Sequence, residues 1–291
     1  MTPSSTSAST RPGRLDGKVA LVTGAARGQG RSHALAMATE GADLIITDVA
    51  GAVDTVGYPL GTEEQLSEVH RELKELGVRV HSSVVDVRDA DAMVEAVAGA
   101  VADLGRLDAV VANAGILHAP ARSWELTPEQ WRTMVDVNLT GVWTTFRAAI
   151  PPMIEAGNGG SLVGISSIAG LRGIPGVSHY VAAKHGVVGL IGSLANELAE
   201  YGIRANSIHP TNVRTPMIDN PLAAKIFRPD LESPTLDDGI DVLKRINLLD
   251  MPWIDASDVT DAVVWLVSDE SKRVTGINLP VDAGMLAKYI G

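Results

Sequence analysis

Seven short runs rich in valine, isoleucine, leucine and alanine alternate along this chain with longer helical patterns. The predicted strands are Val19–Thr23, Asp43–Asp48, Val78–Val84, Leu107–Ala112, Gly160–Ser166, Arg204–His209 and Ile277–Val281. The predicted helices are Gln29–Glu40, Glu63–Leu76, Asp89–Leu104, Pro128–Ala156, Val177–Tyr201 and Ser257–Val267. Continuous apolar runs of this kind are typical of parallel strands that helices cover on both faces. We therefore expect one α/β domain of the Rossmann type, with a doubly wound, seven-stranded parallel sheet.

The expected domain covers residues 15–291 and follows a tail of residues 1–14, rich in serine and threonine, that we expect to be disordered. Two segments interrupt the alternation. Val49–Gly61 contains three glycines and a proline and is an insertion after the second strand. Arg214–Ile254 contains five prolines and follows the sixth strand, at the sheet edge where open α/β folds bind ligands. We interpret it as a mobile substrate lid; the alternative is a surface excursion.

Composition excludes several classes of function. The balance of 24 basic against 35 acidic residues gives a net charge of −11, which repels nucleic acids and anionic membranes. The absence of cysteine excludes disulfides, thiolate metal sites and thiol catalysis. The seven histidines show no metal-binding spacing, so we expect no metal. With neither a secretory signal nor an apolar run of about 18 residues, we expect a cytoplasmic protein with no membrane partner.

A glycine-rich turn joins the first predicted strand to the first predicted helix. In this turn, TGAARGQG, the glycines are Gly24, Gly28 and Gly30, with Arg27 and Gln29 between them. Glycine lets a backbone approach a pyrophosphate closely, and the N-terminus of the next helix offers free N–H groups to phosphates. Its position between a strand and a helix favours a dinucleotide site over a purely structural turn.

Polar residues that follow the next strands extend this site. Asp48 can accept both ribose hydroxyls of NAD and repels the 2′-phosphate of NADP, whereas Arg27 could face such a phosphate. We favour NAD; a solvated strand-end aspartate is the alternative. Asp86-Val87 could receive the adenine, and the small residues of Asn113-Ala114-Gly115 let the chain pass close to a nucleoside. Taken alone, either Asp86-Val87 or Asn113-Ala114-Gly115 would be interpreted as part of an ordinary loop.

The strongest candidate for chemistry is the set of Ser167, Tyr180 and Lys184. Tyr180 and Lys184 are four residues apart and share one helix face. A phenol is a poor base near neutral pH, but an adjacent ammonium and a positive nicotinamide ring favour its phenolate. Ser167, after the fifth strand, can donate a hydrogen bond to a substrate oxygen. His118 and His209 follow strands and are candidates to line a substrate pocket, with simple packing as the alternative.

These residues carry a resemblance to the short-chain dehydrogenase/reductase family, from Leu15 to Lys288. The matching strings are TGAARGQG, NAG, VNLTG, ISS and YVAAK. The resemblance implies that Tyr180 is the general acid/base, that Lys184 lowers its pKa and binds the nicotinamide ribose, and that Ser167 orients the carbonyl. It also implies that Asn138 holds a water in a proton relay, that Val213 and Thr215 contact the cofactor, and that the protein is a homotetramer.

A narrower resemblance links the chain to the mycobacterial carveol dehydrogenase-like group. It rests on the insertion and on GRLDGKVALVTGAARGQGRSHA, HPTNVRTPM and VTGINLPVDAGML. It implies that NAD is held tightly beneath the insertion and is reoxidised by the carrier mycofactocin.

The function we expect is NAD-dependent interconversion of a hydrophobic secondary alcohol, such as a terpenoid, and its ketone. The apolar lid residues Met217, Phe227, Leu231, Leu248, Leu249, Met251 and Trp253 suggest the hydrophobic substrate. The alternatives are an NADPH-dependent ketoacyl reductase, which Asp48 argues against, and a nucleotide-sensing regulator on the same fold.

Overall fold

The computed structural model describes residues 13–289, and a seven-stranded parallel sheet lies at its centre. The strand order is β3-β2-β1-β4-β5-β6-β7, which reverses direction after β1 and so confirms the doubly wound α/β fold. The strands are β1 (Val19–Thr23), β2 (Asp43–Asp48), β3 (Val80–Val84), β4 (Ala109–Ala112), β5 (Gly160–Ile165), β6 (Ile203–Pro210) and β7 (Asn278–Val281).

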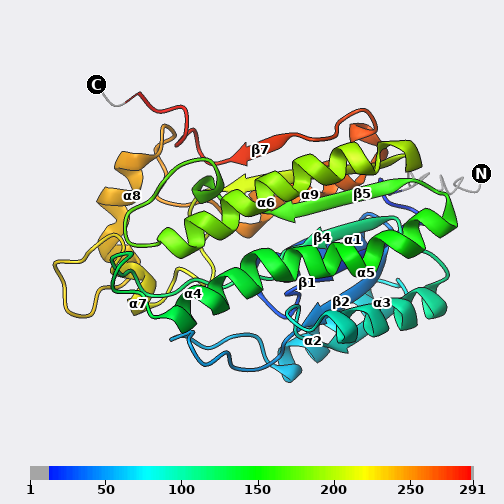
Figure 1. Ribbon diagram of the computed structural model, residues 1–291, viewed down its shortest axis with the longest axis horizontal. Coiled ribbons are helices and arrows are strands. Elements are labelled where there is room, and N and C mark those ends of the chain that lie inside the picture. The colour runs from blue at the N-terminus through cyan, green and yellow to red at the C-terminus, as the bar shows by residue number, and fades with distance from the viewer. Residues whose placement is uncertain (1–12, 290–291) are drawn as a thin grey trace, which may run out of the picture.

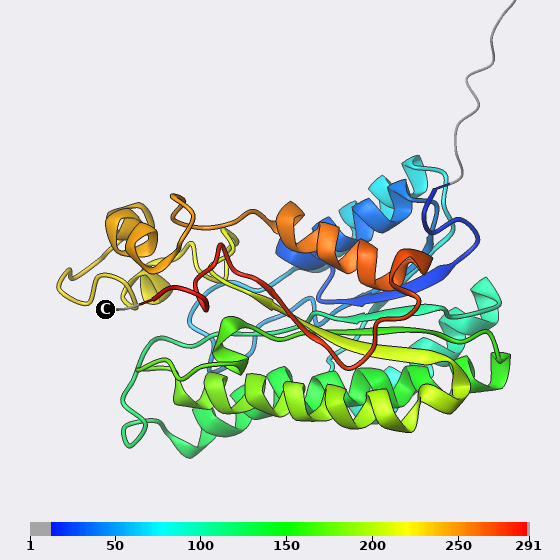
Figure 2. The ribbon, with the colours of Figure 1, turned by 90° about the horizontal axis from the view of Figure 1, so that it is seen from above.

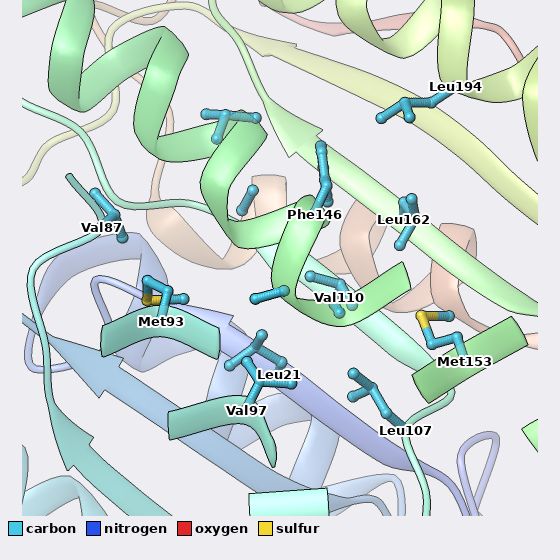
Figure 3. Packing of buried hydrophobic residues seen from close by; sticks show 14 of the residues in the cluster. Leu21, Val87, Met93, Val97, Leu107, Val110, Phe146, Met153, Leu162 and Leu194 are labelled. Atoms are coloured by element: carbon cyan, nitrogen blue, oxygen red, sulfur yellow. The ribbon is translucent and has the colours of Figure 1, made fainter. Parts of the chain in front are cut away.

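Helices cover both faces of the sheet, as Figure 2 shows from above. One face packs against α1 (Gly28–Thr39), α2 (Glu63–Glu75) and α9 (Ala256–Val267). The opposite face packs against α3 (Ala90–Leu104), α5 (Gly141–Ala156) and α6 (Ser178–Glu197), with α4 (Pro128–Val135) preceding α5. Figure 3 shows this second core, in which Leu21, Val110 and Leu162 of the sheet meet helix residues such as Met93 and Phe146. Aliphatic side chains supply nearly all of it, as the low aromatic content requires.

The long helix expected over Pro128–Ala156 is interrupted. It opens as predicted, with Pro128 in the first turn and a capping box between Thr127 and Gln130. Asp136–Thr140 then forms a π-turn that separates α4 from α5. The amide of Asn138 donates to the carbonyl oxygens of Met134 (3.2 Å) and Ile116 (3.1 Å). Such π-turns are frequent at functional sites, and this one places Asn138 against the loop after β4.

The two segments that interrupt the pattern lie at the carboxyl end of the sheet (Figure 1). Arg214–Ile254 contains the short helices α7 (Pro221–Ala224) and α8 (Ile240–Ile246). Its two ends meet at a parallel bridge between Val213 and Ile254, where the Arg214 N–H donates to the Ile254 carbonyl at 3.1 Å. The segment, called the excursion below, therefore leaves the sheet and returns to it at neighbouring positions.

The first described residues are fixed to the domain. Arg14 donates from its backbone N–H and its guanidinium to the Glu40 carboxylate, at 3.0 and 2.7 Å. Gly13 and Arg14, which we placed in the tail, thus belong to the folded part, and residues 1–12 of that tail lie outside the described residues. Within residues 13–289, no helix is long and apolar enough to cross a bilayer.

Candidate active site

In the glycine turn, backbone segments pack so closely that there is no room for a side chain between them. A Cβ on Gly30 would lie 2.1 Å from the Gly24 carbonyl oxygen, and one on Gly24 would lie 2.9 Å from Cα of Ala114. Gly24 also has a φ of 67°, in the left-handed region. Helix α1 begins within this string, at Gly28, with no side-chain cap and no acidic residue in its first turn. Its free N–H groups and positive dipole end therefore suit an anion such as a pyrophosphate.

Most of the residues predicted to bind the cofactor line a single cavity. They are Gly24, Arg27, Gly28, Gln29, Asp48, Asp86, Val87, Asn113, Ala114, Gly115 and Thr215. Gly30 is buried in the first turn of α1 and lines neither cavity, and Val213 lines a neighbouring cavity together with Thr215. Gln29 lines both cavities, and among the described residues its buried Oε1 has no hydrogen-bond partner. The bare turn, the uncapped helix and this unpaired oxygen fit a dinucleotide.

Asp48 closes the end of β2 beside the turn. Its carboxylate is buried and accepts hydrogen bonds from the backbone N–H groups of Ala26 at 3.0 Å and Ala50 at 3.1 Å. These bonds fix the carboxylate at the cavity wall and leave lone pairs for further donors. Arg27 lies with its guanidinium 5.9 Å from the ring centre of Tyr58. Burial lowers the pKa of Arg27, while the charges of Tyr58 and Asp48 act to raise it.

Asp86 has a partner that the sequence did not indicate. Arg88 donates to its carboxylate through Nε at 2.9 and 3.0 Å and through its backbone N–H at 2.9 Å. Burial alone would raise the pKa of Asp86, but the bonds and charge of Arg88 lower it overall. The carboxylate is therefore ionised and already engaged, although it still lines the cavity.

Ser167, Tyr180 and Lys184 come together where β5 ends beside α6. Tyr180 and Ser167 line a second cavity, adjacent to the first. Lys184 lies behind them: its Nζ donates to the Ile165 carbonyl at 2.8 Å and sits 5.6 Å from the ring centre of Tyr180. The Ser167 Oγ accepts the Ala169 N–H at 3.1 Å, which leaves its hydroxyl proton available to a substrate oxygen or to Tyr180.

The protein alone does not make Tyr180 a strong base near neutral pH. Burial raises the pKa of Tyr180 to about 12; a hydrogen bond with Ser167 opposes this rise, and the nearby phenol of Tyr58 adds to it. Burial also lowers the pKa of Lys184 to about 8. The Lys184 ammonium alone therefore does not bring the pKa of the Tyr180 phenol close to neutral pH. A further positive charge is needed, and an oxidised nicotinamide carries one.

Asn138 lies behind the cavities, fully buried. Its Oδ1 accepts the Ile116 N–H at 3.2 Å while its Nδ2 donates to the Ile116 carbonyl at 3.1 Å. A Cβ on Gly115 would lie 2.8 Å from this Oδ1 and 3.7 Å from Nζ of Lys184, so only glycine fits there. Gly115 therefore lies between the side chains of Asn138 and Lys184.

The second cavity has a volume of about 320 Å³ and mainly apolar walls. The excursion contributes Met217, Ile218, Ile226, Phe227, Val242 and Ile246 to it, and Leu117, Ile174, Val177 and Met285 complete much of the rest. Only Met217 and Phe227 of the expected lid residues line it. Leu248 and Leu249 are more than half exposed. Met251 packs against the core on the side of the sheet that α1, α2 and α9 cover, and Trp253 packs against the small core that the excursion forms with Leu117 and Val177. Sequence composition shows that such a segment is apolar but not which side chains turn inward.

Neither histidine that we considered for the pocket lines either cavity. His209 is buried and bonds the Ser167 carbonyl oxygen through Nδ1 at 2.8 Å, so it supports Ser167 from below. His118 bonds His179 at 3.2 Å. Sequence reasoning did not assign Leu117, although the preceding NAG string is the signal that could have found it. Among residues 13–289 no group of three histidine, aspartate or glutamate side chains could hold a metal ion.

Comparison with known proteins agrees with this geometry. Residues 18–225 match the short chain dehydrogenase family. The chain is 49% identical to (−)-trans-carveol dehydrogenase of Rhodococcus erythropolis, over 94% of this chain and 99% of that protein. It is 34% identical to cyclohexanol dehydrogenase of an Acinetobacter strain, over 94% and 97%. The crystal structure of carveol dehydrogenase from Mycobacterium avium in complex with NAD superposes with a TM-score of 0.93 and is 47% identical, covering 95% of this chain and all of that one. This chain therefore belongs to the short-chain dehydrogenase family.

Proposed function

We propose that this protein is an NAD-dependent dehydrogenase that interconverts a hydrophobic secondary alcohol, of the carveol type, and its ketone. The observation that carries the proposal is the placement of Tyr180 and Ser167 on the wall of an apolar cavity that adjoins the glycine-lined one. The NAD-bound carveol dehydrogenase neighbour and the relatives that act on cyclic alcohols support the same substrate class.

Different residues of the chain bind the cofactor, orient the alcohol and transfer its proton. The turn and the start of α1 hold the pyrophosphate, and Asp48 accepts the hydroxyls of the adenosine ribose. When bound, NAD supplies the acceptor for the hydride of the carbinol carbon. Ser167 donates a hydrogen bond to the substrate oxygen, and the Tyr180 phenolate takes the alcohol proton. Lys184 stabilises that phenolate from behind, and Asn138 holds Ile116 and the nearby backbone in place.

Changing Asp48 tests the choice of cofactor. We expect Asp48→Ala to weaken the binding of NAD by about tenfold or more, because a charge-assisted hydrogen-bond acceptor is lost. The preference of the enzyme for NAD over NADP should also narrow, because a charge that repels the 2′-phosphate is removed. Asp48→Asn is the matched control, since it removes the charge and keeps the shape. Fluorescence titration with NAD and NADP measures both effects. A wild-type protein that already prefers NADP would contradict this role.

The pH profile tests Tyr180 as the base. Because burial holds the pKa of Tyr180 above neutrality, the phenolate is the minor form at pH 7, and alcohol oxidation should rise about tenfold per pH unit below the operative pKa. Ketone reduction needs the phenol and should fall as the pH rises through the same pKa. Lys184→Met should move the oxidation limb to higher pH. These shifts are read from kcat/KM between about pH 6 and 10; a flat oxidation profile would exclude Tyr180 as the titrating base.

We propose further that the nucleotide stays bound between turnovers and is reoxidised by mycofactocin, and that the protein is a homotetramer. The insertion supports retention of the nucleotide, because its residues Val49, Val53, Tyr58, Leu60 and Gly61 all line the glycine-lined cavity.

The outer side of α6 supports the homotetramer. Cβ atoms on Gly189 and Gly192 would meet open space there. Trp131 of α4 and Trp143 of α5 are also more than two-fifths exposed.

A further inference from the structure

Three consecutive residues after β4, Ile116–His118, form a segment that reaches both cavities. Ile116 lines the glycine-lined cavity, and Leu117 lines the apolar cavity beside Tyr180. All three side chains are buried. A small shift of this segment would therefore change the wall that an alcohol meets.

The catalytic elements hold this segment from one side. Asn138 of the π-turn bonds both the N–H and the carbonyl of Ile116, at 3.2 and 3.1 Å. His179, which directly precedes Tyr180, bonds His118 between ring nitrogens at 3.2 Å. Burial lowers the pKa of both histidines, that of His179 to about 4, so both rings are neutral near pH 7 and share one hydrogen bond.

The insertion holds the same segment from the other side. The Tyr58 hydroxyl accepts the N–H of Leu117 at 3.2 Å, and the Thr55 hydroxyl bonds Nε2 of His118 at 3.0 Å. Tyr58 is only 9% exposed, and Val56 and Leu60 pack against the core that contains Ile116. Two hydroxyl groups from a segment some sixty residues earlier in the chain thus bond two adjacent residues of the wall.

We propose that Thr55 and Tyr58 are positioning residues for the alcohol: they fix Leu117, so that the insertion shapes the substrate cavity as well as the nucleotide cavity. The physical basis is the buried Leu117 N–H, whose partner in the described structure is the Tyr58 hydroxyl. Without that oxygen the segment must either leave a donor unpaired or move to satisfy it. The proposal rests on the dehydrogenase function proposed above.

The test uses variants that remove only the hydroxyl groups. Tyr58→Phe keeps the ring on the nucleotide cavity, Thr55→Val keeps the side-chain shape, and Thr55→Ser restores the hydroxyl. With NAD saturating, we expect Tyr58→Phe to raise KM for carveol about tenfold, the effect of one unpaired buried donor, and to reduce discrimination between carveol enantiomers. Thr55→Val should act in the same direction and Thr55→Ser should restore wild-type values.

Tyr201→Phe and Thr39→Val are matched controls, because both residues are exposed and remote from the cavities. Amide hydrogen exchange at Leu117, measured without alcohol, gives a second readout and should accelerate in Tyr58→Phe. Unchanged KM, enantiomer discrimination and exchange in both hydroxyl variants would overturn the proposal. Failure of the proposed function would show differently, as a wild-type protein that oxidises no alcohol, and exchange at Leu117 would then still decide whether Tyr58 holds the wall.

Discussion

Tyr180→Phe is expected to bind NAD almost normally and to lose between about a hundredfold and ten-thousandfold of kcat, the usual contribution of a positioned general acid or base. The substitution keeps the ring that lines the apolar cavity and removes only the oxygen that exchanges a proton with the substrate. Tyr180 is partly buried in the cavity wall, and burial raises the pKa of its phenol to about 12.

Single-turnover measurement of NADH formation separates this chemical step from product release. Tyr201→Phe is the matched control, because Tyr201 is 43% exposed in the short 3-10 turn that follows α6. A Tyr180→Phe enzyme that keeps more than about a tenth of kcat would exclude Tyr180 as the proton-transfer group.

The second large effect concerns the insertion. Replacing Val49–Gly61 by a short glycine-containing turn should convert a protein that is purified with NAD into one that is purified empty. We expect labelled NAD to exchange at least about tenfold faster, because a closed segment over a ligand raises the barrier to its release. The insertion lines the glycine-lined cavity and also reaches the excursion, where a Cβ on Gly57 would lie 2.4 Å from Leu222.

Two controls make this result specific. Thermal unfolding shows whether the shortened protein keeps its sheet, and kcat with excess NAD and saturating alcohol shows whether the catalytic residues remain in place. Equal occupancy and equal exchange rates in both proteins would mean that the insertion is an exposed loop or a subunit contact. That outcome would leave the assignment of Tyr180 untouched.

The sequence was most informative where local patterns decide structure. The buried strands β1 and β2 are largely apolar and match their predicted limits, because both faces of each are covered. The glycine turn and the spacing of Tyr180 and Lys184 are equally local signals, and the structure places these residues around two adjoining cavities.

What could not be predicted depends on contacts between distant segments. The π-turn at Asn138 forms where that side chain meets Ile116, and an uninterrupted helical pattern does not reveal it. The pairing of Asp86 with Arg88 depends on the shape of one turn. The pKa of Tyr180 depends on burial, which the spacing of Tyr180 and Lys184 along a helix cannot show.

The bridge between Val213 and Ile254 has an evolutionary consequence. The chain leaves the sheet and returns to it at neighbouring points, so the stretch between them can change in length or sequence without altering the strand order. That stretch supplies Met217, Phe227 and Ile246 to the apolar cavity, whereas Ser167 and Tyr180 come from elements that it does not interrupt. Changes in this stretch after Thr215 can therefore alter the walls of the apolar cavity while Ser167 and Tyr180 keep their places.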